Sequence, residues 1–168
     1  MAIDLKRTAR GALAGAIAAG VWAIQQPIDK RLFGVPYDDV ELLGKFATRG
    51  RAWPLAGTAM HLLNGALFGA LYANVAPYVP LPAWAKGPAA GMAEHLASWP
   101  GVRMIGKIHP AAGDFPPLWG DHMAFAQATW RHLLFGLVLG EAERALNPPA
   151  PAASEASAPA PADAASAR

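Results

Sequence analysis

Five polar side chains lie within or close to the long apolar stretches of this sequence: His61, Asn64, Glu94, His95 and His132. An imidazole with a pKa of about 6.5 exchanges protons near neutral pH, and a carboxylate is a suitable partner for it. An ionisable group at membrane depth is costly, so it usually faces neighbouring helices and has a partner there. These residue types predict an intramembrane polar cluster in which Glu94 titrates and His61 and His132 relay protons or ions.

Two of these histidines open nearly identical stretches, HLLNGALFG at residues 61–69 and HLLFGLVLG at residues 132–140. At helical spacing each histidine shares a face with the two glycines that follow it. A common packing role, in which each ring donates to a neighbouring helix, explains His61 and His132 more simply than a relay. Both interpretations stay open for this pair.

Glu94 and His95 differ from the other members because the repeated pattern does not account for them. When the two halves of the chain are aligned, their counterparts are Ala18 and Ala19. A charged pair that the repeat does not require is the better candidate for a specific role. Glu94 is therefore the strongest candidate for a functional residue in this sequence.

The sequence carries no pattern that identifies a catalytic or cofactor site. It has no cysteine, which excludes disulfides, thiolate catalysis and cysteine-based metal sites. The three histidines and Glu94 are ligand types that suit zinc or iron, but no two of them have ligand spacing along one helix. Phosphate-binding loops, dinucleotide fingerprints and the nucleophile elbow are missing as well. We expect no catalytic residue, no metal and no cofactor, and hence no enzyme.

The composition narrows the class of protein. Of 168 residues, 54% are hydrophobic and 15% are charged, whereas an average soluble domain has about 25% charged residues. The net charge of +2 is too small to indicate a nucleic-acid partner. Ala, Leu and Gly dominate the apolar residues, so the mean hydropathy suits a membrane helix of small residues and a soluble alanine-rich helix alike.

Four apolar segments are predicted to be helices: residues 11–27, 55–77, 87–100 and 123–146. The first is expected to end near Pro27. Asp38 and Glu41 have the spacing of a capping box, which predicts a short helix over residues 39–48 at a membrane surface. Residues 101–122 are polar and rich in Pro and Gly, so we expect a loop there.

The four segments pair as two copies of a helical hairpin. Each first helix opens with G-x-x-x-G and leaves through Pro and then Arg, and each second helix carries H-L-L-x-G-x-x-x-G. Glycines four residues apart let another backbone approach closely, which holds helices together in lipid. The glycines predicted to pack helices are Gly11, Gly15, Gly65, Gly69, Gly87, Gly91, Gly136 and Gly140.

The predicted fold class is all-α, a bundle of four transmembrane helices. Residues 1–146 form the membrane domain, with repeat one at 11–76 and repeat two at 87–146. Residues 147–168 form a tail of Pro, Ala and Ser without core-forming residues, which predicts disorder. Aromatic residues at the segment ends fit the belts found at membrane interfaces: Trp53, Tyr78, Trp84, Trp99 and Trp119.

Two alternatives to this bundle remain. A soluble alanine-rich helical bundle is favoured by the third segment, which is barely long enough to cross a membrane and carries Glu94 and His95. A secretory signal would open with the same basic residues, but no A-x-A site closes the first apolar run. The basic residues of the first long loop favour the opposite orientation, but the basic N-terminus and the even number of crossings predict that both termini are cytoplasmic.

The layout resembles a known group. The glycine-rich first helix, the Pro-then-Arg exit, the His-bearing second helix and a last helix ending in EAER resemble the YagU-like group of small bacterial inner-membrane proteins. The likeness covers residues 8–146 in layout. It implies an integral membrane protein without an established activity, and it supplies no catalytic residues.

The expected functions belong to different classes. The first is a multi-pass protein of the bacterial inner membrane with a structural or partner-binding role. Its partners would be the lipid bilayer, other membrane proteins, or a second copy bound through an outward glycine face. The second is a small proton or ion transporter or channel that uses Glu94 with His61 and His132. No nucleic acid is expected in either case.

Overall fold

The computed structural model describes residues 4–148, and all regular secondary structure in that range is helical. The α-helices are α1 (Leu5–Phe33), α2 (Asp39–Ala47), α3 (Trp53–Val75), α4 (Ala83–Ser98), α5 (Val102–Ile108) and α6 (His122–Leu146). Short 3-10 turns are formed by Ala76–Tyr78, Trp99–Gly101 and Ala112–Asp114. The all-α class predicted from the sequence is confirmed for this range, whereas most of the predicted tail lies outside the described residues.

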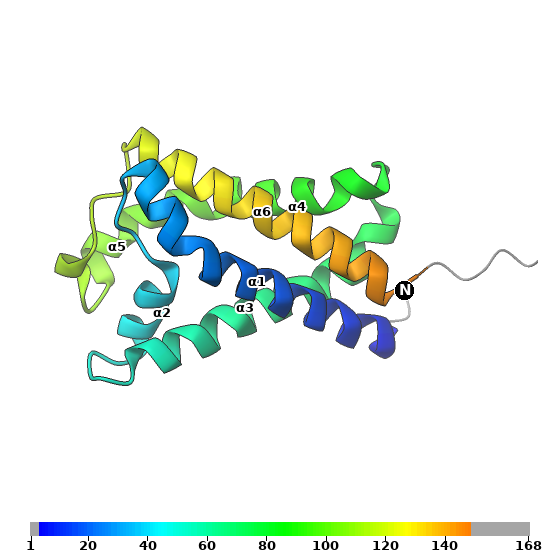
Figure 1. The fold of residues 1–168 in the computed structure, drawn as a ribbon, viewed down its shortest axis with the longest axis horizontal. Coiled ribbons are helices and arrows are strands. Elements are labelled where there is room, and N and C mark those ends of the chain that lie inside the picture. Colours follow the sequence, from blue (N-terminus) through cyan, green and yellow to red (C-terminus); the bar gives the residue numbers. More distant parts are fainter. Residues whose placement is uncertain (1–3, 149–168) are drawn as a thin grey trace, which may run out of the picture.

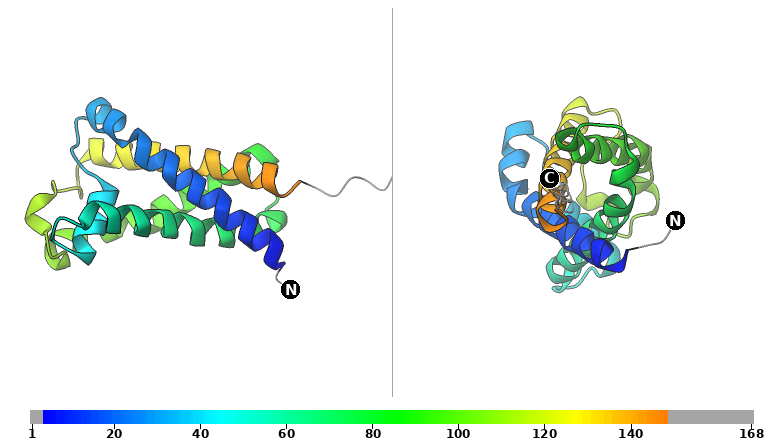
Figure 2. Two further views of the ribbon diagram at one scale, coloured as in Figure 1. Left: turned by 60° about the horizontal axis from the view of Figure 1, so that its bottom comes forward. Right: turned by 90° about the vertical axis from the view of Figure 1, so that its right-hand side faces the viewer.

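Four long helices form an elongated bundle, with α2 and α5 at the end opposite the N-terminus (Figure 1). Helices α1 and α6 pack against each other in the middle. Helix α3 packs on α1, and α4 packs on α6, whereas α3 and α4 make no comparable contact with each other. The view along the long axis shows α3 and α4 on separate sides of the α1–α6 pair (Figure 2). Helices α3 and α4 are therefore the two outer helices of the bundle.

Helix α1 is longer than the sequence indicates. The prediction that it ends near Pro27 is wrong, because the helix includes that proline and continues to Phe33. Gly34, with a φ of 69°, ends it in the left-handed conformation that glycine adopts without steric penalty. The turn after Pro27 carries Asp29 and Lys30, which bind Arg131 and Asp38. These ion pairs stabilise a helical turn that the proline by itself would weaken.

The segment 101–122 is not a plain loop, because it contains α5. Val102 and Ile105 of this short helix pack against a small apolar cluster of Val35, Leu118 and Ala124. Val35 follows α1, whereas Leu118 and Ala124 lie just before and at the start of α6, so the residues of α5 by themselves do not indicate the helix. The predicted short helix at 39–48 is present as α2, and the Asp38 side chain accepts from the backbone N–H groups of Val40 and Glu41.

The eight predicted packing glycines lie where the helices of each hairpin cross. In the first hairpin, a Cβ on Gly15 would lie 1.9 Å from the carbonyl oxygen of Gly65, and one on Gly69 would lie 2.2 Å from that of Gly11. In the second, a Cβ on Gly87 would lie 2.1 Å from the carbonyl oxygen of Gly136. Only glycine permits such backbone contact, so both hairpins close in the same manner. Their origin by duplication stays a prediction.

These contacts correct one expectation about oligomers. All eight glycines face helices of the same chain, so they are not available to bind a second copy through an outward glycine face. The close approach of backbones also explains why the bundle interior holds mainly Ala and Gly between α1 and α3. Ala19, which faces Gly65 of α3, is 1% exposed.

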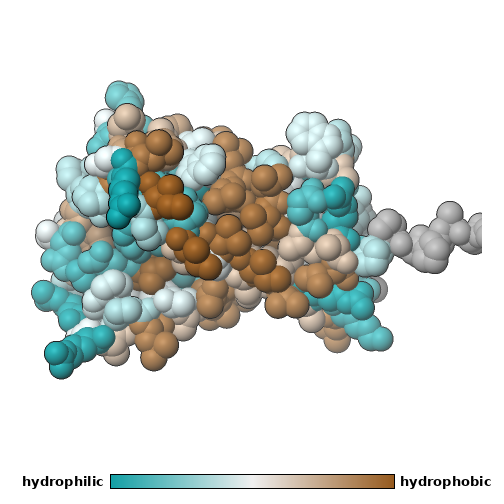
Figure 3. Space-filling model, in the orientation of Figure 1, coloured by the Kyte–Doolittle hydropathy of each residue, from teal (hydrophilic) through white to brown (hydrophobic). Residues whose placement is uncertain are grey.

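Large apolar side chains lie on the outside of the bundle, and several polar side chains lie inside. Ile24 is 80% exposed and Leu67 is 63% exposed. The buried polar side chains are Gln26, Asp29, His61, His95, Gln127, Arg131 and Glu143. The space-filling view shows apolar residues across the middle of the visible face, with hydrophilic residues towards both ends (Figure 3).

Candidate functional site

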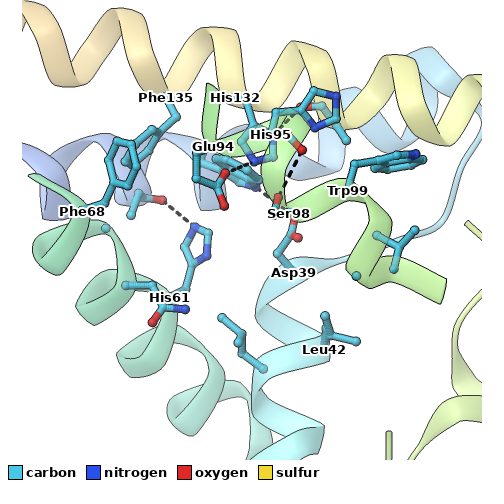
Figure 4. A pocket seen from close by; sticks show the side chains of 18 of the residues that line it. Asp39, Leu42, His61, Phe68, Glu94, His95, Ser98, Trp99, His132 and Phe135 are labelled. Atoms are coloured by element: carbon cyan, nitrogen blue, oxygen red, sulfur yellow. Dashed lines mark hydrogen bonds and ion pairs between the residues drawn. The ribbon is translucent and has the colours of Figure 1, made fainter. Parts of the chain in front are cut away.

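A cavity of about 710 Å³ opens between the outer helices, and all five members of the predicted polar cluster line it. Its walls come from all six helices, with Trp22 from α1, Asp39 from α2 and Phe68 from α3. His61 and Asn64 lie on α3, Glu94 and His95 on α4, and His132 on α6. Because α3 packs on α1 and α4 packs on α6, these residues, which are distant in the sequence, lie around one cavity (Figure 4).

Glu94 and His132 are in direct contact. The Oε2 of Glu94 lies 2.6 Å from the Nε2 of His132. The Nδ1 of His132 is 2.7 Å from the carbonyl oxygen of Ala128, so Nδ1 must carry a proton that it donates. A contact of 2.6 Å between Nε2 and a carboxyl oxygen then requires a second proton, on the imidazole or on the carboxyl group. The pair therefore holds one exchangeable proton between two side chains, and its summed charge is zero.

His95 is fully buried beside this pair. Its Nε2 lies 3.1 Å from the Oγ1 of Thr129, whose own hydroxyl donates to the carbonyl oxygen of Phe125 at 2.9 Å. Thr129 therefore accepts, which assigns the proton of His95 to Nε2 and leaves Nδ1 as a bare acceptor. Among the described protein atoms this buried Nδ1 has no partner. The ring centroids of His95 and His132 are 4.7 Å apart.

His61 is on the opposite wall of the cavity. Its Nε2 donates to the carbonyl oxygen of Ala19 at 3.1 Å, which ties α3 to α1. Its ring packs edge-on against Trp22 with 5.6 Å between centroids, and Trp22 packs against His132 in the same way at 4.7 Å. His61 thus has the contacts expected of a packing residue. His61 and His132 are separated by the indole ring of Trp22 rather than joined by a hydrogen bond.

The polar cluster does not form a metal-binding group. Across residues 4–148, no three His, Asp or Glu side chains are close enough together to hold an ion. Asn64 is exposed and lines the cavity. What the site offers is a shared proton at Glu94 and His132, an unpartnered acceptor at His95, and an apolar wall around them.

Sequence reasoning missed a second set of polar residues at one end of the cavity. Arg131 donates from Nε and Nη2 to the two carboxylate oxygens of Asp29, at 2.7 and 2.6 Å. Its Nη1 donates to Asp39 at 2.7 Å. Arg131 and Asp29 are 1% and 0% exposed. Gln127 also donates to Asp29 at 2.9 Å, so the buried charges are paired and hydrogen-bonded.

One signal could have pointed to this pair. Arg131 interrupts an apolar segment and stands next to His132, and an arginine in such a segment requires a partner. A helix that ends near Pro27, as the sequence predicts, would leave Asp29 in the loop that follows it. Because α1 continues to Phe33, Asp29 lies in its last turns and is buried in the bundle.

The connection between α1 and α2 extends this set of polar residues. Asp39 links Arg131 to the cavity, since its Oδ2 also accepts from the indole N–H of Trp22 at 3.0 Å. Burial and the neighbouring Asp39 carboxylate raise the pKa of Tyr37 well above its ordinary value. Burial opposes ionisation of Asp38, but the Lys30 ammonium and the α2 backbone amides outweigh it and lower the pKa of this carboxyl.

The other end of the bundle is joined by a separate ion pair. Arg7 of α1 contacts Glu143 of α6 at 2.6 Å and donates from Nε to the carbonyl oxygen of Ala73 on α3. Asn147 donates to Glu143 at 3.2 Å. An ion pair therefore joins α1 to α6 at each end of their contact, Asp29 with Arg131 at one end and Arg7 with Glu143 at the other.

Comparison with protein-family models, curated proteins and solved structures found no match to this chain. By length and mean hydropathy, α1 is the one helix within residues 4–148 that qualifies as a membrane span. A single such helix near the N-terminus is weak support for a membrane protein, because core helices and signal sequences meet the same criterion.

Proposed function

We propose that this chain is a multi-pass protein of the bacterial inner membrane, with a structural or partner-binding role there. Helices α1, α3, α4 and α6 would cross the bilayer. The observation that supports this most is the distribution of side chains, with large apolar residues outside and charged residues inside. The layout of the sequence motifs, which resembles the YagU-like group, supports the assignment to a bacterial inner membrane.

The exposed apolar residues lie on each of the long helices. On α1 they include Ile24 and Leu32, on α3 Leu55 and Leu67, and on α6 Leu137. Contiguous apolar surface of this kind is unfavourable in water and marks contact with a partner or a membrane. In lipid, by contrast, ionisable groups must face other helices, as Asp29 and Arg131 do here.

The lengths of the helices fit this proposal unevenly. Helices α1, α3 and α6 have 29, 23 and 25 residues, and at about 1.5 Å per residue each exceeds a hydrocarbon core of about 30 Å. Helix α4 has 16 residues, which gives roughly 24 Å. It would reach through the core only with local thinning of the bilayer or with the turn that follows it.

Fractionation tests the proposal directly. Membranes from expressing cells are washed with sodium carbonate and with high salt, and the protein is followed in pellet and supernatant. An integral membrane protein stays in the pellet after both washes. A water-soluble helical bundle, the competing arrangement, would leave the membrane and remain folded and monomeric in buffer without detergent, and that result would reject the proposal.

A second function is favoured by one contact, the proton held between Glu94 and His132 at 2.6 Å. We propose as the alternative a proton or ion transporter in which this pair, with His61 across the cavity, exchanges the proton. The separation of His61 from the pair by Trp22 means that water or a side-chain movement would have to complete the path.

Proton flux into vesicles that contain the purified protein tests the alternative. Glu94→Gln keeps the shape of the side chain and removes the titrating group, so flux should fall to the level of empty vesicles. Glu141→Gln, at an exposed carboxylate on α6, is the matched control and should retain flux. Equal flux in wild type and Glu94→Gln, or none in either, would reject transport without affecting the proposed membrane location.

A further inference from the structure

We propose that the end of the bundle formed by α2 and α5 binds the head groups of anionic phospholipids. The residues that bind them, called the basic surface below, are Arg31, Arg49, Arg51, Arg103 and Lys107. The inference rests on the proposed membrane location, and it adds the class of lipid that one end of the bundle contacts. It depends on the exposed cations of this end and does not involve the cavity.

The cations of the basic surface come from three parts of the chain that meet at one end of the bundle. They lie in the last turn of α1, in the connection between α2 and α3, and on α5. All three parts are at the end opposite the N-terminus (Figure 1). His109, which follows α5, has its Nε2 3.0 Å from the carbonyl oxygen of Leu42 on α2. The fold therefore gathers cations that are distant in the sequence.

Within residues 4–148, none of these cations forms an ion pair with a carboxylate. All five are exposed. The exposed carboxylates of the same end have other partners, since those of Glu41 and Asp114 contact Lys45 and that of Asp121 caps α6. Exposed cations without a counter-charge of their own attract anions from outside the protein.

Arg103 has the surroundings that a phosphate needs. Its guanidinium lies over the ring of Trp119, 5.0 Å from the ring centroid. Stacking of this kind orients the guanidinium plane and leaves its N–H donors free at the edge, where they match two oxygens of a phosphate. Both residues line a hollow of about 270 Å³ beside α5, and Arg103 is the one charged residue among those that line it. The hollow therefore offers space for a phosphate next to this guanidinium.

Exposed apolar side chains beside the cations favour a lipid over other polyanions. On α5, Met104 and Ile108 are 44% and 66% exposed, and each directly follows a cation of the basic surface in the sequence. Val102 and Ile105, on the other side of α5, pack against the bundle. Cations and apolar side chains therefore share the outer side of α5, as they do on helices that lie in a membrane interface. A nucleic acid has phosphates but no acyl chains to cover these apolar groups.

Titrations of the purified full-length protein test the inference. Dioleoylphosphatidylglycerol, dioleoylphosphatidylcholine and inorganic phosphate are each added to the protein in one neutral detergent, and the midpoint of thermal unfolding is recorded. A ligand that binds the folded state raises this midpoint. We expect a saturable rise with phosphatidylglycerol, weakened by high salt because salt screens exposed charges, and little change with the other two. Equal rises with both lipids, or with phosphate and phosphatidylglycerol, would overturn the inference.

Two double variants locate the surface. Arg103→Gln with Lys107→Gln removes two cations four residues apart, and the affinity for phosphatidylglycerol should fall roughly fivefold for each cation removed. Lys6→Gln with Arg10→Gln removes two exposed cations of the same spacing at the opposite end of the bundle and should change the affinity little. Equal losses would show a general attraction to positive charge and would overturn the assigned place. Should the α5 variant fail to fold, Arg49→Gln with Arg51→Gln makes the same comparison.

Fractionation distinguishes a failure of this inference from a failure of the membrane proposal. A protein that stays in the carbonate-washed pellet but shows no preference for phosphatidylglycerol refutes the lipid assignment alone. A protein that leaves the membrane refutes the spanning bundle, and its binding is then measured by sedimentation with vesicles of either lipid in plain buffer. There, preferential binding to phosphatidylglycerol vesicles would support the basic surface, and equal binding or none would refute it.

Discussion

Arg131 and Asp29 form a buried two-point ion pair at one end of the α1–α6 contact, although 102 residues separate them in the sequence. The pair joins α6 to α1, and through Asp39 it also holds the start of α2. Both side chains are almost completely removed from solvent. A buried charge without its partner is strongly destabilising, so this contact constrains which helices pack together.

Asp29→Asn should lower the free energy of unfolding by about 3–5 kcal/mol, because it leaves the buried Arg131 guanidinium without its main counter-charge. Denaturant unfolding followed by circular dichroism measures this change. Arg144→Gln removes the exposed pair with Glu141 and should leave stability nearly unchanged, as is usual for surface ion pairs. A loss in Asp29→Asn as small as that of the control would contradict the role assigned to the pair.

Gly15→Ala should destabilise the first hairpin by about 1–3 kcal/mol, since a methyl group would have to move the α1 and α3 backbones apart. The added Cβ would lie only 1.9 Å from the Gly65 carbonyl oxygen. Gly20→Ala is the control on the same helix, because its Cβ would meet only the end of Leu62 at 3.9 Å. That change should be neutral or stabilise by up to about 1 kcal/mol through helix propensity. Thermal unfolding of both variants distinguishes the two sites, and equal effects would show that the crossing is not tight.

Acid should weaken the connection between α1 and α2. The pKa of Asp38 is lowered from 3.8 in the folded protein, so its stabilising contribution is complete above that pH and is lost as the pH falls through the folded pKa. Asp38→Asn can still cap α2 but cannot ionise. Wild type should therefore lose more stability than Asp38→Asn between about pH 5 and pH 2. Parallel pH profiles for the two proteins would refute the assigned role of this carboxylate.

Leu63→Lys separates the lipid-facing proposal from a soluble bundle. Leu63 is exposed near the middle of α3 and does not line the cavity. A lysine at the centre of a membrane helix costs about 2.5–3.5 kcal/mol of insertion free energy, so the fraction in carbonate-washed membranes should fall. Leu5→Lys, at the start of α1, should be tolerated because the side chain can reach the interface. Increased solubility of Leu63→Lys without loss of fold would instead indicate a surface that faces water.

The sequence by itself determined the local features of this protein. The length of the apolar segments indicated the long helices, Asp38 and Glu41 indicated α2, and the spacing of the glycines indicated where helices would approach closely. These features depend on residues a few positions apart, so a single segment contains the whole signal. The sequence also predicted the members of the polar cluster, including Glu94 and His132, because ionisable residues are rare in apolar segments.

Only the tertiary structure decided which of these groups meet. The continuation of α1 through Pro27 depends on Asp29 and Lys30 finding partners elsewhere in the chain. Helix α5 depends on apolar side chains outside it, Val35 after α1 and Leu118 and Ala124 near the start of α6. The contact of Glu94 with His132 and the bare nitrogen of His95 follow from the packing of α4 on α6. The residues next to a side chain in the sequence do not specify its partner on another helix. A buried charge requires an opposite charge beside it, and this requirement arises only when the helices have packed together.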